Sequence, residues 1–426
     1  MSEILKSNRI FLGLSISAFF FWALALAVPT GYSYGAVGIF LFSLLGFKGA
    51  VMHGIDKATW RLAGLLVVTG LLWGSTFDGW LSWSDTDYWA KYWLAAFCMV
   101  VVAYRGIDPR TIPWALAGGS LGAMAVALYQ YHYLGISKAS GFTNAIQYGG
   151  IAMYLGIATW TFALLGGYQR RYSFILWILG SFGVLASVLS ETRGAWVVAP
   201  LLLLAIWMLL LQHGHRRLAV YAVITSLFLG VVTLIPLWER VEGRVQQALV
   251  ETHAYRENPE QAVNTSIGQR LEQWQLAWRL GMEQPFTGWG VEGFVARKKE
   301  YVDLGWADPS VNDYGHAHNE ILDMFAKRGL IGVSGLLLFY VIPLAIFWPS
   351  RRRIYALPAQ QQKNGLALRT VASLLPIAYF GFGWTQVFFA HNSGHMFYIF
   401  SLVALWGGIC YLEGKTRSLY VDDKTA

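Results

Sequence analysis

The sequence predicts an all-α, polytopic integral membrane protein. We expect about twelve transmembrane helices and a large helical loop outside the membrane between the ninth and tenth of them. Two observations predict this fold class. Of the 426 residues, 56% are hydrophobic and only 13% are charged, which is more apolar surface than a water-soluble domain can bury. The apolar residues also gather in stretches of about 20, the length that crosses a bilayer core as a helix.

The apolar stretches give the order of the predicted transmembrane helices. They cover residues 10–28, 33–47, 60–77, 89–104, 112–134, 147–168, 173–190, 194–212, 218–237, 329–349, 366–388 and 393–412. The second stretch is short and rich in glycine, so twelve is a best count. The first stretch has no small-residue cleavage site before Pro29, which predicts a retained helix rather than a signal peptide.

The short connections alternate in charge along the chain. Every second connection carries lysine or arginine, as both termini do, and the first two connections between them, at 29–35 and around Asp78, Asp85 and Asp87, are neutral or acidic. By the positive-inside rule, both termini are predicted to be cytoplasmic in a bacterial inner membrane, and the segment 238–317 to be periplasmic. The net charge of +8 therefore indicates topology and contact with anionic membrane lipids, not nucleic-acid binding.

The predicted organisation has three parts. Residues 1–237 form nine transmembrane helices, residues 238–328 form the periplasmic loop, and residues 329–426 form three more helices and a cytoplasmic tail. The loop contains one amphipathic pattern at Trp238, Val241, Val245 and Leu249, and a second at Leu271, Trp274, Trp278 and Met282. Ser266 and Gln269 make a capping-box pattern before the second helix. Two helices lying on the membrane surface would explain the apolar faces but not the basic residues of the loop.

Three basic residues come from separate external loops. They are Lys138, Arg193 and Arg270. A single arginine at a membrane edge ordinarily extends toward lipid headgroups, and Glu191 is a potential partner for Arg193. Together, the three cations predict a diphosphate site, because guanidinium groups match phosphate oxygens and the helix N-terminus beside Arg270 adds N–H donors.

A His-Ala-His-Asn run at residues 316–319 opens a short predicted helix that Gly329 can cap. His318, Leu322 and Phe325 would share one face, which places His318 over an apolar floor near the membrane surface. A neutral imidazole there can accept the proton of a sugar hydroxyl or orient that hydroxyl.

Other interpretations of the polar residues remain open. His316 and His318, with Glu320 and Asp323, could bind zinc, but their spacing is not that of a helical zinc site, so a general base is the favoured interpretation. A structural or gating role suits His316 equally well. The Asp-Thr-Asp run at 85–87 resembles a metal–nucleotide motif, yet external acidic residues are also what topology favours. Two further histidines lie in the last external turn, His391 and His395. They either line the same site as His318 or lie at the membrane interface.

The sequence contains no phosphate-binding loop, dinucleotide fingerprint or nucleophile elbow. The energy for a reaction would then come from an activated, membrane-embedded substrate, and we expect no cofactor and no metal.

Several short motifs occur in an order that resembles a known family. They are Ser-Gly-Phe-Thr-Asn at 140–144, Ser-Glu-Thr-Arg-Gly-Ala at 190–195, Arg-x-x-x-Trp-x-x-Ala at 270–277, Pro-Phe-Thr-Gly-Trp-Gly-Val-Glu-Gly-Phe at 285–294, His-Ala-His-Asn-Glu-x-Leu at 316–322 and Arg-Gly-Leu-Ile-Gly at 328–332. From about residue 110 to its end, the chain resembles the O-antigen ligase and polymerase superfamily of bacterial envelope glycosyltransferases.

The resemblance implies a function and a site. The family transfers glycan from undecaprenyl diphosphate to an acceptor sugar on the periplasmic face, without metal or nucleotide. In the ligase branch, the acceptor is the lipid A–core oligosaccharide of lipopolysaccharide. Arg193 and Arg270 match the diphosphate-binding arginines and His318 matches the essential histidine, with His316, Lys138 and Asn319 as secondary candidates. Direct displacement would invert the anomeric carbon.

Three alternatives to a ligase remain. An O-antigen polymerase would use the same donor and the same residues. A secondary transporter or glycan flippase would place charges at mid-membrane, where this chain has few. A metal-dependent oligosaccharyltransferase would use Asp85 and Asp87.

Overall fold

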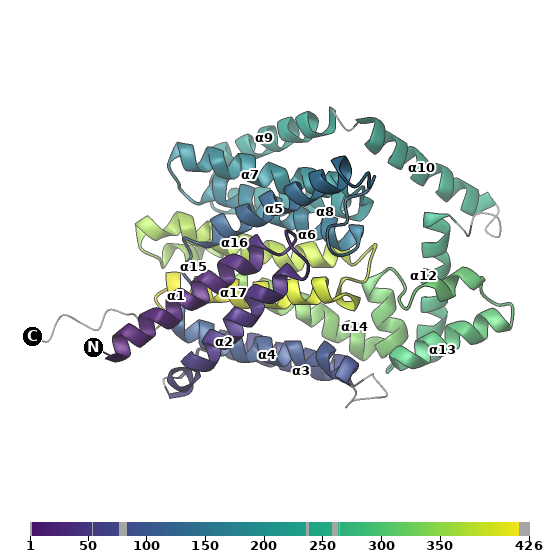
Figure 1. Cartoon of the computed structure of the whole chain (residues 1–426), viewed down its shortest axis with the longest axis horizontal. Coiled ribbons are helices and arrows are strands. Elements are labelled where there is room, and N and C mark those ends of the chain that lie inside the picture. The colour runs from purple at the N-terminus through teal and green to yellow at the C-terminus, as the bar shows by residue number, and fades with distance from the viewer. Residues whose placement is uncertain are drawn as a thin grey trace, which may run out of the picture.

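The computed structural model describes residues 2–52, 54–75, 83–235, 238–257, 263 and 265–416. Within these ranges, every regular element is a helix and no β-strand occurs, which confirms the all-α prediction. Long helices run side by side as a bundle, and α10, α12 and α13 lie together at one end of it (Figure 1).

Twelve long helices fall on the predicted stretches. They are α1 Ser2–Ala23, α2 Gly31–Met52, α3 Lys57–Gly74, α4 Trp83–Arg105, α5 Ile112–His132, α6 Ala145–Leu165, α7 Arg170–Leu189, α8 Arg193–Gln212, α9 Arg216–Leu234, α14 Glu320–Phe347, α16 Ala359–Phe382 and α17 Asn392–Leu412. Among the described residues, eight helices are long and apolar enough to span a membrane: α2, α5–α8, α14, α16 and α17. The polytopic prediction is confirmed, and the count of twelve stays a prediction. The predicted shortness of the second helix was wrong, because α2 has 22 residues.

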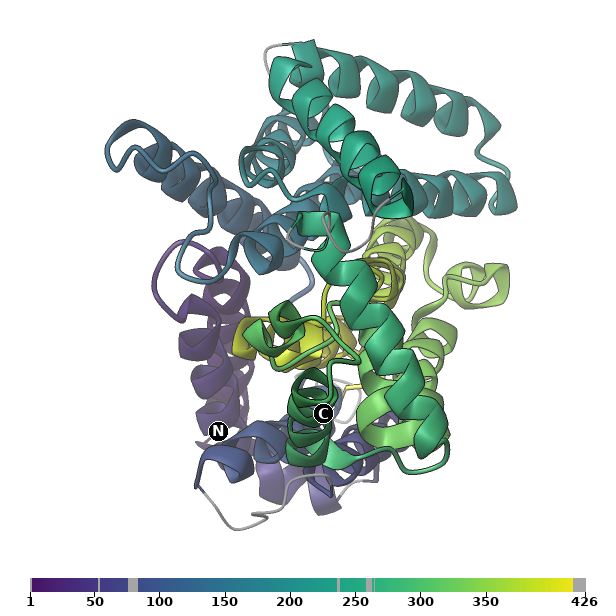
Figure 2. The ribbon, with the colours of Figure 1, turned by 90° about the vertical axis from the view of Figure 1, so that its right-hand side faces the viewer.

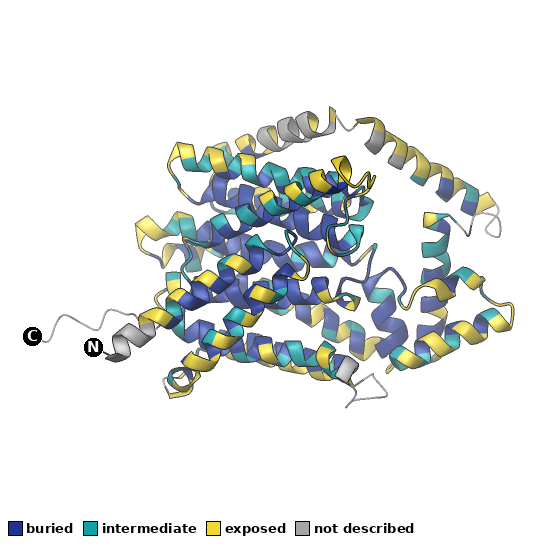
Figure 3. Ribbon diagram, in the orientation of Figure 1, coloured by how far each residue is buried: buried dark blue, intermediate teal, exposed yellow. Residues whose placement is uncertain are grey.

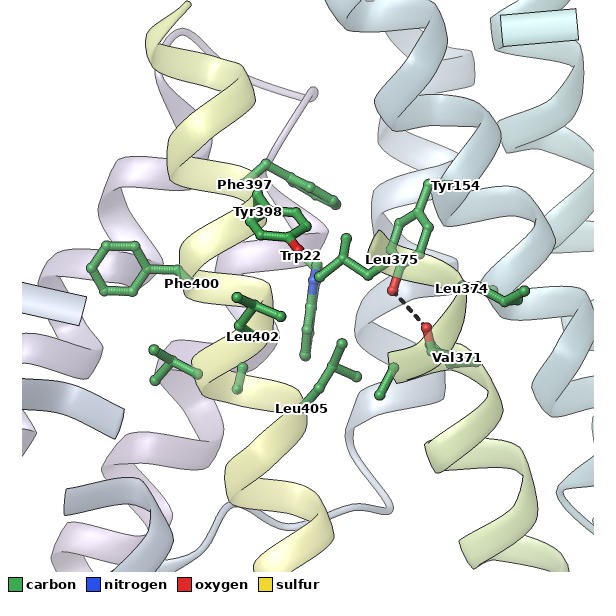
Figure 4. Close-up of a cluster of buried hydrophobic side chains, with 14 of the residues drawn as sticks. Trp22, Tyr154, Val371, Leu374, Leu375, Phe397, Tyr398, Phe400, Leu402 and Leu405 are labelled. Atoms are coloured by element: carbon green, nitrogen blue, oxygen red, sulfur yellow. Dashed lines mark hydrogen bonds between the residues drawn. The ribbon is translucent and has the colours of Figure 1, made fainter. Parts of the chain in front are cut away.

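The centre of the bundle is built from α6, α16 and α17. These helices are buried almost all round, whereas α2 and α8 expose apolar outer faces (Figure 3). Aromatic and leucine side chains fill the centre (Figure 4). Two of its buried polar groups are paired: Trp22 Nε1 donates to Ser401 Oγ at 3.0 Å, and Tyr154 Oη donates to the Val371 carbonyl at 3.2 Å. Pairing removes the cost of burying a polar group without a partner.

The basic connections gather at one end of the bundle. Arg351 Nε donates to the Gln212 carbonyl at 2.5 Å, which joins two of these connections. At the same end, the Phe11 and Tyr411 rings stack at 4.9 Å, so the first and last helices meet there. The alternation in charge along the sequence thus corresponds to two ends of the structure, and the compartment that each end faces stays a prediction.

The opposite end carries the predicted loop as α10 Trp238–Glu257, α12 Ser266–Glu283, α13 Gly290–Asp303 and the 3-10 helix η2 Pro309–Asp313. Figure 2 looks onto this end and shows the green helices of the loop crossing in front of the bundle. Two other short elements, α15 Arg351–Tyr355 and η3 Phe388–Ala390, lie in the connections on either side of α16.

The structure corrects one prediction about the loop. Thr265, not Ser266, caps α12, because its side chain accepts from Gly268 N at 3.0 Å. Trp278 and Met282 of the predicted apolar face are 54% and 55% exposed, so the rest of the protein does not cover this face, and its contact with the membrane stays a prediction. The buried face instead carries Leu276, Ala277, Leu280 and Gly281. A Cβ at Gly281 would overlap the Phe325 ring, so small residues let this face approach α14 closely.

Helix α14 changes direction at Gly329, whose φ of +58° and ψ of −158° are not helical. Residues 320–328 therefore form a separate short segment, as predicted, and Gly329 ends it. A side chain there would overlap the Phe286 backbone, so the position requires glycine for both space and φ. The break coincides with the predicted boundary at 328, although the three-part division itself stays a prediction.

Candidate active site

Four segments converge at the end of the bundle that carries the loop. They are the turn before α8, the first turns of α12, residues 314–319, and the α16–α17 connection at 383–391. Gly194 lets the start of α8 pack directly against this connection, because a Cβ there would lie 2.1 Å from Thr385 Oγ1. The turn before α8 is tight: Glu191 has a φ of +53°, and Ser190 Oγ and Thr192 Oγ1 lie 2.7 Å apart.

This arrangement brings two of the predicted cations together. Arg193 is the first residue of α8, and Arg270 lies in the second turn of α12. Burial lowers the pKa of Arg270, repulsion from the positive charge of Arg193 lowers it further, and the negative charge of Glu251 opposes the shift, so the two guanidinium groups lie within electrostatic reach. Two half-buried like charges near one another favour the binding of an anion such as a diphosphate.

His318 lies beside this pair, just before α14. Its backbone has a φ of +53°, and its side chain is buried, with the residue only 8% exposed. Asn319 caps α14 by accepting from the N–H groups of Ile321 and Leu322, both at 3.1 Å. Because the helix begins after His318, the predicted helical face shared with Leu322 and Phe325 is wrong. A non-glycine residue at positive φ is strained, and such strain concentrates at functional sites.

The hydrogen bonds of His318 define its tautomer. His318 Nδ1 lies 2.9 Å from Gln386 Oε1, and the same oxygen accepts from Val387 N at 3.1 Å. An atom that accepts from a backbone N–H is the amide oxygen, so Nδ1 must carry the proton that it donates. The lone pair then lies on Nε2, as a general base requires.

The charge state of His318 suits the same role. Burial lowers the pKa of His318 to about 4, the positive charge of Arg270 lowers it too, and the bond to Gln386 opposes the shift. The ring is therefore neutral at neutral pH and can accept a proton.

Other rings surround His318. The Tyr314 and His316 ring centroids lie 4.6 and 4.4 Å from that of His318, and His391 lies 5.4 Å from His316. Burial lowers the pKa of His316 to about 3, with a further contribution from His318. The predicted histidine His395 lies apart from this cluster on α17, where it is 1% exposed and packs 5.0 Å from the Tyr88 ring.

The remaining predicted residues have other surroundings. Lys138 is exposed, in a loop whose Ala139 N donates to the Leu189 carbonyl at 3.0 Å. Asn319 serves as a helix cap, and its amide also donates to the Trp384 carbonyl at 3.2 Å.

The proposed acidic metal motif gains no support from its surroundings. The side chain of Asp85 lies outside the described residues, and the exposed Asp87 pairs with Lys91 Nζ at 2.5 Å. Among the described residues, no group of three or more His, Cys, Asp or Glu side chains is arranged to hold a metal ion. Independence from metal stays a prediction.

Two important residues were missed by the sequence analysis. Gln386 stands 68 positions from His318, in a connection without a recognisable motif. Lys298 lies on α13, where its Nζ donates to the Val311 carbonyl at 2.6 Å and to the Tyr314 carbonyl. Burial lowers the pKa of Lys298 to about 8. Lys298 is 2% exposed, but nothing in the sequence of this mainly polar helix indicates that it is buried. Its two hydrogen bonds hold in place the segment that carries Tyr314 and the histidines.

Comparison with known proteins agrees with this geometry. Residues 174–337, which contain Arg193, Arg270 and His318, match the model of the O-antigen ligase family. An uncharacterized protein of Haemophilus influenzae is 27% identical over 300 residues, which cover 70% of this chain and 73% of the relative. The resemblance indicated by the motifs is thus confirmed over residues 174–337, which match the O-antigen ligase family.

Proposed function

We propose that the protein is an O-antigen ligase of the bacterial inner membrane, with its active site on the periplasmic side. It would transfer a polysaccharide from undecaprenyl diphosphate to the lipid A–core oligosaccharide, with inversion at the anomeric carbon and without metal. One observation carries the proposal: a neutral, oriented imidazole, His318, lies beside a pair of mutually repelling arginines, Arg193 and Arg270.

The arginine pair suits the donor. A lipid diphosphate gains negative charge as its bond to the glycan breaks, and two preplaced guanidinium groups stabilise that charge. Because no water needs to reorganise around these groups, the stabilisation acts mainly on the transition state.

His318 suits the acceptor. Its Nε2 accepts the proton of the acceptor hydroxyl as the oxygen forms a bond to the anomeric carbon. The bond from that carbon to the diphosphate oxygen breaks, and its electron pair leaves with undecaprenyl diphosphate. The imidazolium then returns the proton to water. General-base help of this kind contributes about 10²–10⁴-fold to a rate.

The histidine cluster suggests roles for the secondary candidates. His316 shields one side of His318 and adds no positive charge to it, because burial holds the pKa of His316 at about 3. Asn319 positions His318 by fixing the start of α14 and its contact with Trp384. Lys138 would meet only the outer part of the donor, since it stands exposed.

Reconstitution of the purified protein tests the proposal. The protein, in nanodiscs with chelator, is given glycan-loaded undecaprenyl diphosphate and lipid A–core. We expect glycan on lipid A–core, none with His318→Ala, and a normal product with His253→Ala, a matched change at an exposed histidine of α10.

The products distinguish the alternatives. A ladder of longer lipid-linked glycan, with lipid A–core unmodified, would make the protein a polymerase. Dependence of transfer on added metal would favour a metal-dependent oligosaccharyltransferase that uses Asp85 and Asp87. Movement of intact donor across the membrane with no new product would make it a transporter.

A further inference from the structure

A cavity of about 300 Å³ adjoins the histidine cluster, and its wall includes two acidic side chains, a lysine and an arginine. His316 and Gly315 form one side of it, and the first segment of α14 forms another. Its wall consists of Tyr88, Val291, Gly315, His316, Glu320, Asp323, Met324, Lys327, Arg328, Val387, Phe389 and Ala390. Neither Arg193 nor Arg270 belongs to this wall, so the cavity is separate from the arginine pair.

Four acidic and basic side chains of the cavity wall are deeply buried. Glu320, Asp323, Lys327 and Arg328 are 1–4% exposed, and burial raises the pKa of Glu320 to about 8, so its carboxyl group is protonated at neutral pH. Lys327 Nζ pairs with Asp323 Oδ2 at 2.9 Å, and Asp323 Oδ1 accepts from Ala317 N at 2.9 Å. A protonated carboxyl group and a guanidinium beside this ion pair offer both donors and acceptors, which suits a ligand with hydroxyl groups.

Several polar atoms of the wall lack a hydrogen-bond partner. Among the described residues, these include Glu320 Oε1, Arg328 Nε and His316 Nδ1. The rest of the Glu320 and Arg328 side chains is held in place: Glu320 Oε2 accepts from Phe389 N at 3.2 Å, and the guanidinium of Arg328 lies 5.3 Å above the Trp73 ring. Buried polar groups in native proteins are normally paired, so unpaired ones in a cavity wall point to a ligand with hydroxyl groups.

We infer that this cavity binds a sugar of the acceptor, whose hydroxyl groups satisfy Glu320, Arg328 and His316. The inference rests on the proposed function. Displacement with inversion needs the acceptor hydroxyl on the opposite side of the anomeric carbon from the diphosphate. The arginines lie outside the cavity wall, and His316, which belongs to the wall, is one ring contact of 4.4 Å from His318. An acceptor held in the cavity would therefore extend past His316 to bring its reacting hydroxyl to His318.

The test measures acceptor binding without catalysis. Full-length protein in nanodiscs is titrated with delipidated core oligosaccharide by calorimetry, and separately with undecaprenyl diphosphate. Gly315→Phe would fill the cavity, because a Cβ at Gly315 meets no atom within 4 Å and its φ is not positive. Gly243→Phe is the matched control, since this glycine of α10 also has open space around it and lies far from the cavity wall.

We expect Gly315→Phe to weaken oligosaccharide binding at least tenfold and to leave undecaprenyl diphosphate binding unchanged. The control Gly243→Phe should leave the binding of both ligands unchanged. Glu320→Gln, which keeps the shape and the bond to Phe389, should weaken oligosaccharide binding several-fold. This second variant keeps the test decisive if the phenylalanine disturbs the fold.

Three results would overturn the inference. The first is an unmodified protein that binds no core oligosaccharide, and the second is unchanged oligosaccharide binding in both variants. The third is a Gly315→Phe protein that keeps the oligosaccharide but loses affinity for glycan-loaded donor, which would assign the cavity to the donor glycan. Failure of the unmodified protein to bind undecaprenyl diphosphate would instead count against the proposed function itself.

Discussion

The centre of the bundle and the end that carries the loop, called here the polar end, differ in how their side chains pack. In the centre, Trp22 and Tyr154 each donate to a near neighbour, and aromatic rings fill the space between helices (Figure 4), although other buried polar atoms of the described residues there, such as Thr370 Oγ1, have no hydrogen-bond partner. At the polar end, Arg193 and Arg270 repel one another, and His318 adopts a positive φ. Like charges and a strained backbone beside a histidine are unfavourable features that a bound substrate would relieve.

The largest effect should follow removal of the base. His318→Ala should lower the rate of transfer about 10²–10⁴-fold, because the acceptor hydroxyl loses its proton acceptor. Its thermal stability should fall modestly, because alanine keeps the positive φ while the buried ring and its bond to Gln386 are lost. Rates from reconstituted protein and a thermal melt measure the two effects. Normal transfer by the variant would exclude His318 as the base.

The arginine pair should show the next largest effect. Arg193→Ala and Arg270→Ala should each weaken binding of undecaprenyl diphosphate about 10–100-fold. A loss of this size corresponds to one or two charge-assisted hydrogen bonds. Each should also leave thermal stability unchanged or raised, because one of two repelling charges is gone. Calorimetric titration and a melt test both. A large loss of stability would show that the pair is structural.

The pH dependence tests the environment of His318. With its pKa near 4, transfer should stay constant from pH 8 down to about 5 and fall only as the ring is protonated. Gln386→Glu places a negative charge beside Nδ1, which favours the protonated ring and raises its pKa. The acid limb of kcat/KM should therefore move to higher pH in this variant. An unchanged profile would remove Gln386 as the positioning residue.

The same pKa shifts affect stability. His316 and His318 are neutral in the folded protein, with pKa values of about 3 and 4, while the unfolded chain takes up protons near pH 6.5. The contribution of these two neutral histidines to the free energy of unfolding is complete above about pH 6.5 and is lost as the pH falls toward 4. A double variant with glutamine at both positions should therefore lose less stability between pH 7 and 5, as melts at each pH would show.

The smallest effect should come from the centre of the bundle. Trp22→Phe removes the bond to Ser401 and should reduce the free energy of unfolding by about 1–3 kcal/mol. Transfer per folded molecule should not change, because no site residue touches this cluster. Reduced activity in fully folded protein would show that the two regions are coupled.

Composition and pattern were enough to predict the fold class, the approximate helix ranges and the break at Gly329. They also predicted that the basic connections lie at one end of the bundle. They also identified Arg193, Arg270 and His318 as candidates, because cations and histidines outside the membrane are conspicuous against an apolar background. These features are local, since each depends on residue type and spacing within about one helix.

Only the tertiary structure decided which faces meet. Helix α12 has apolar residues around most of its circumference, and close packing of Gly281 on Phe325 selected the buried face. Lys327 and Arg328, which precede the predicted helix cap at Gly329, are each 4% exposed and line a cavity. Gln386 reaches His318 across 68 residues. Such contacts depend on how rigid helices pack, and helical periodicity carries no information about the partner that a given face will meet.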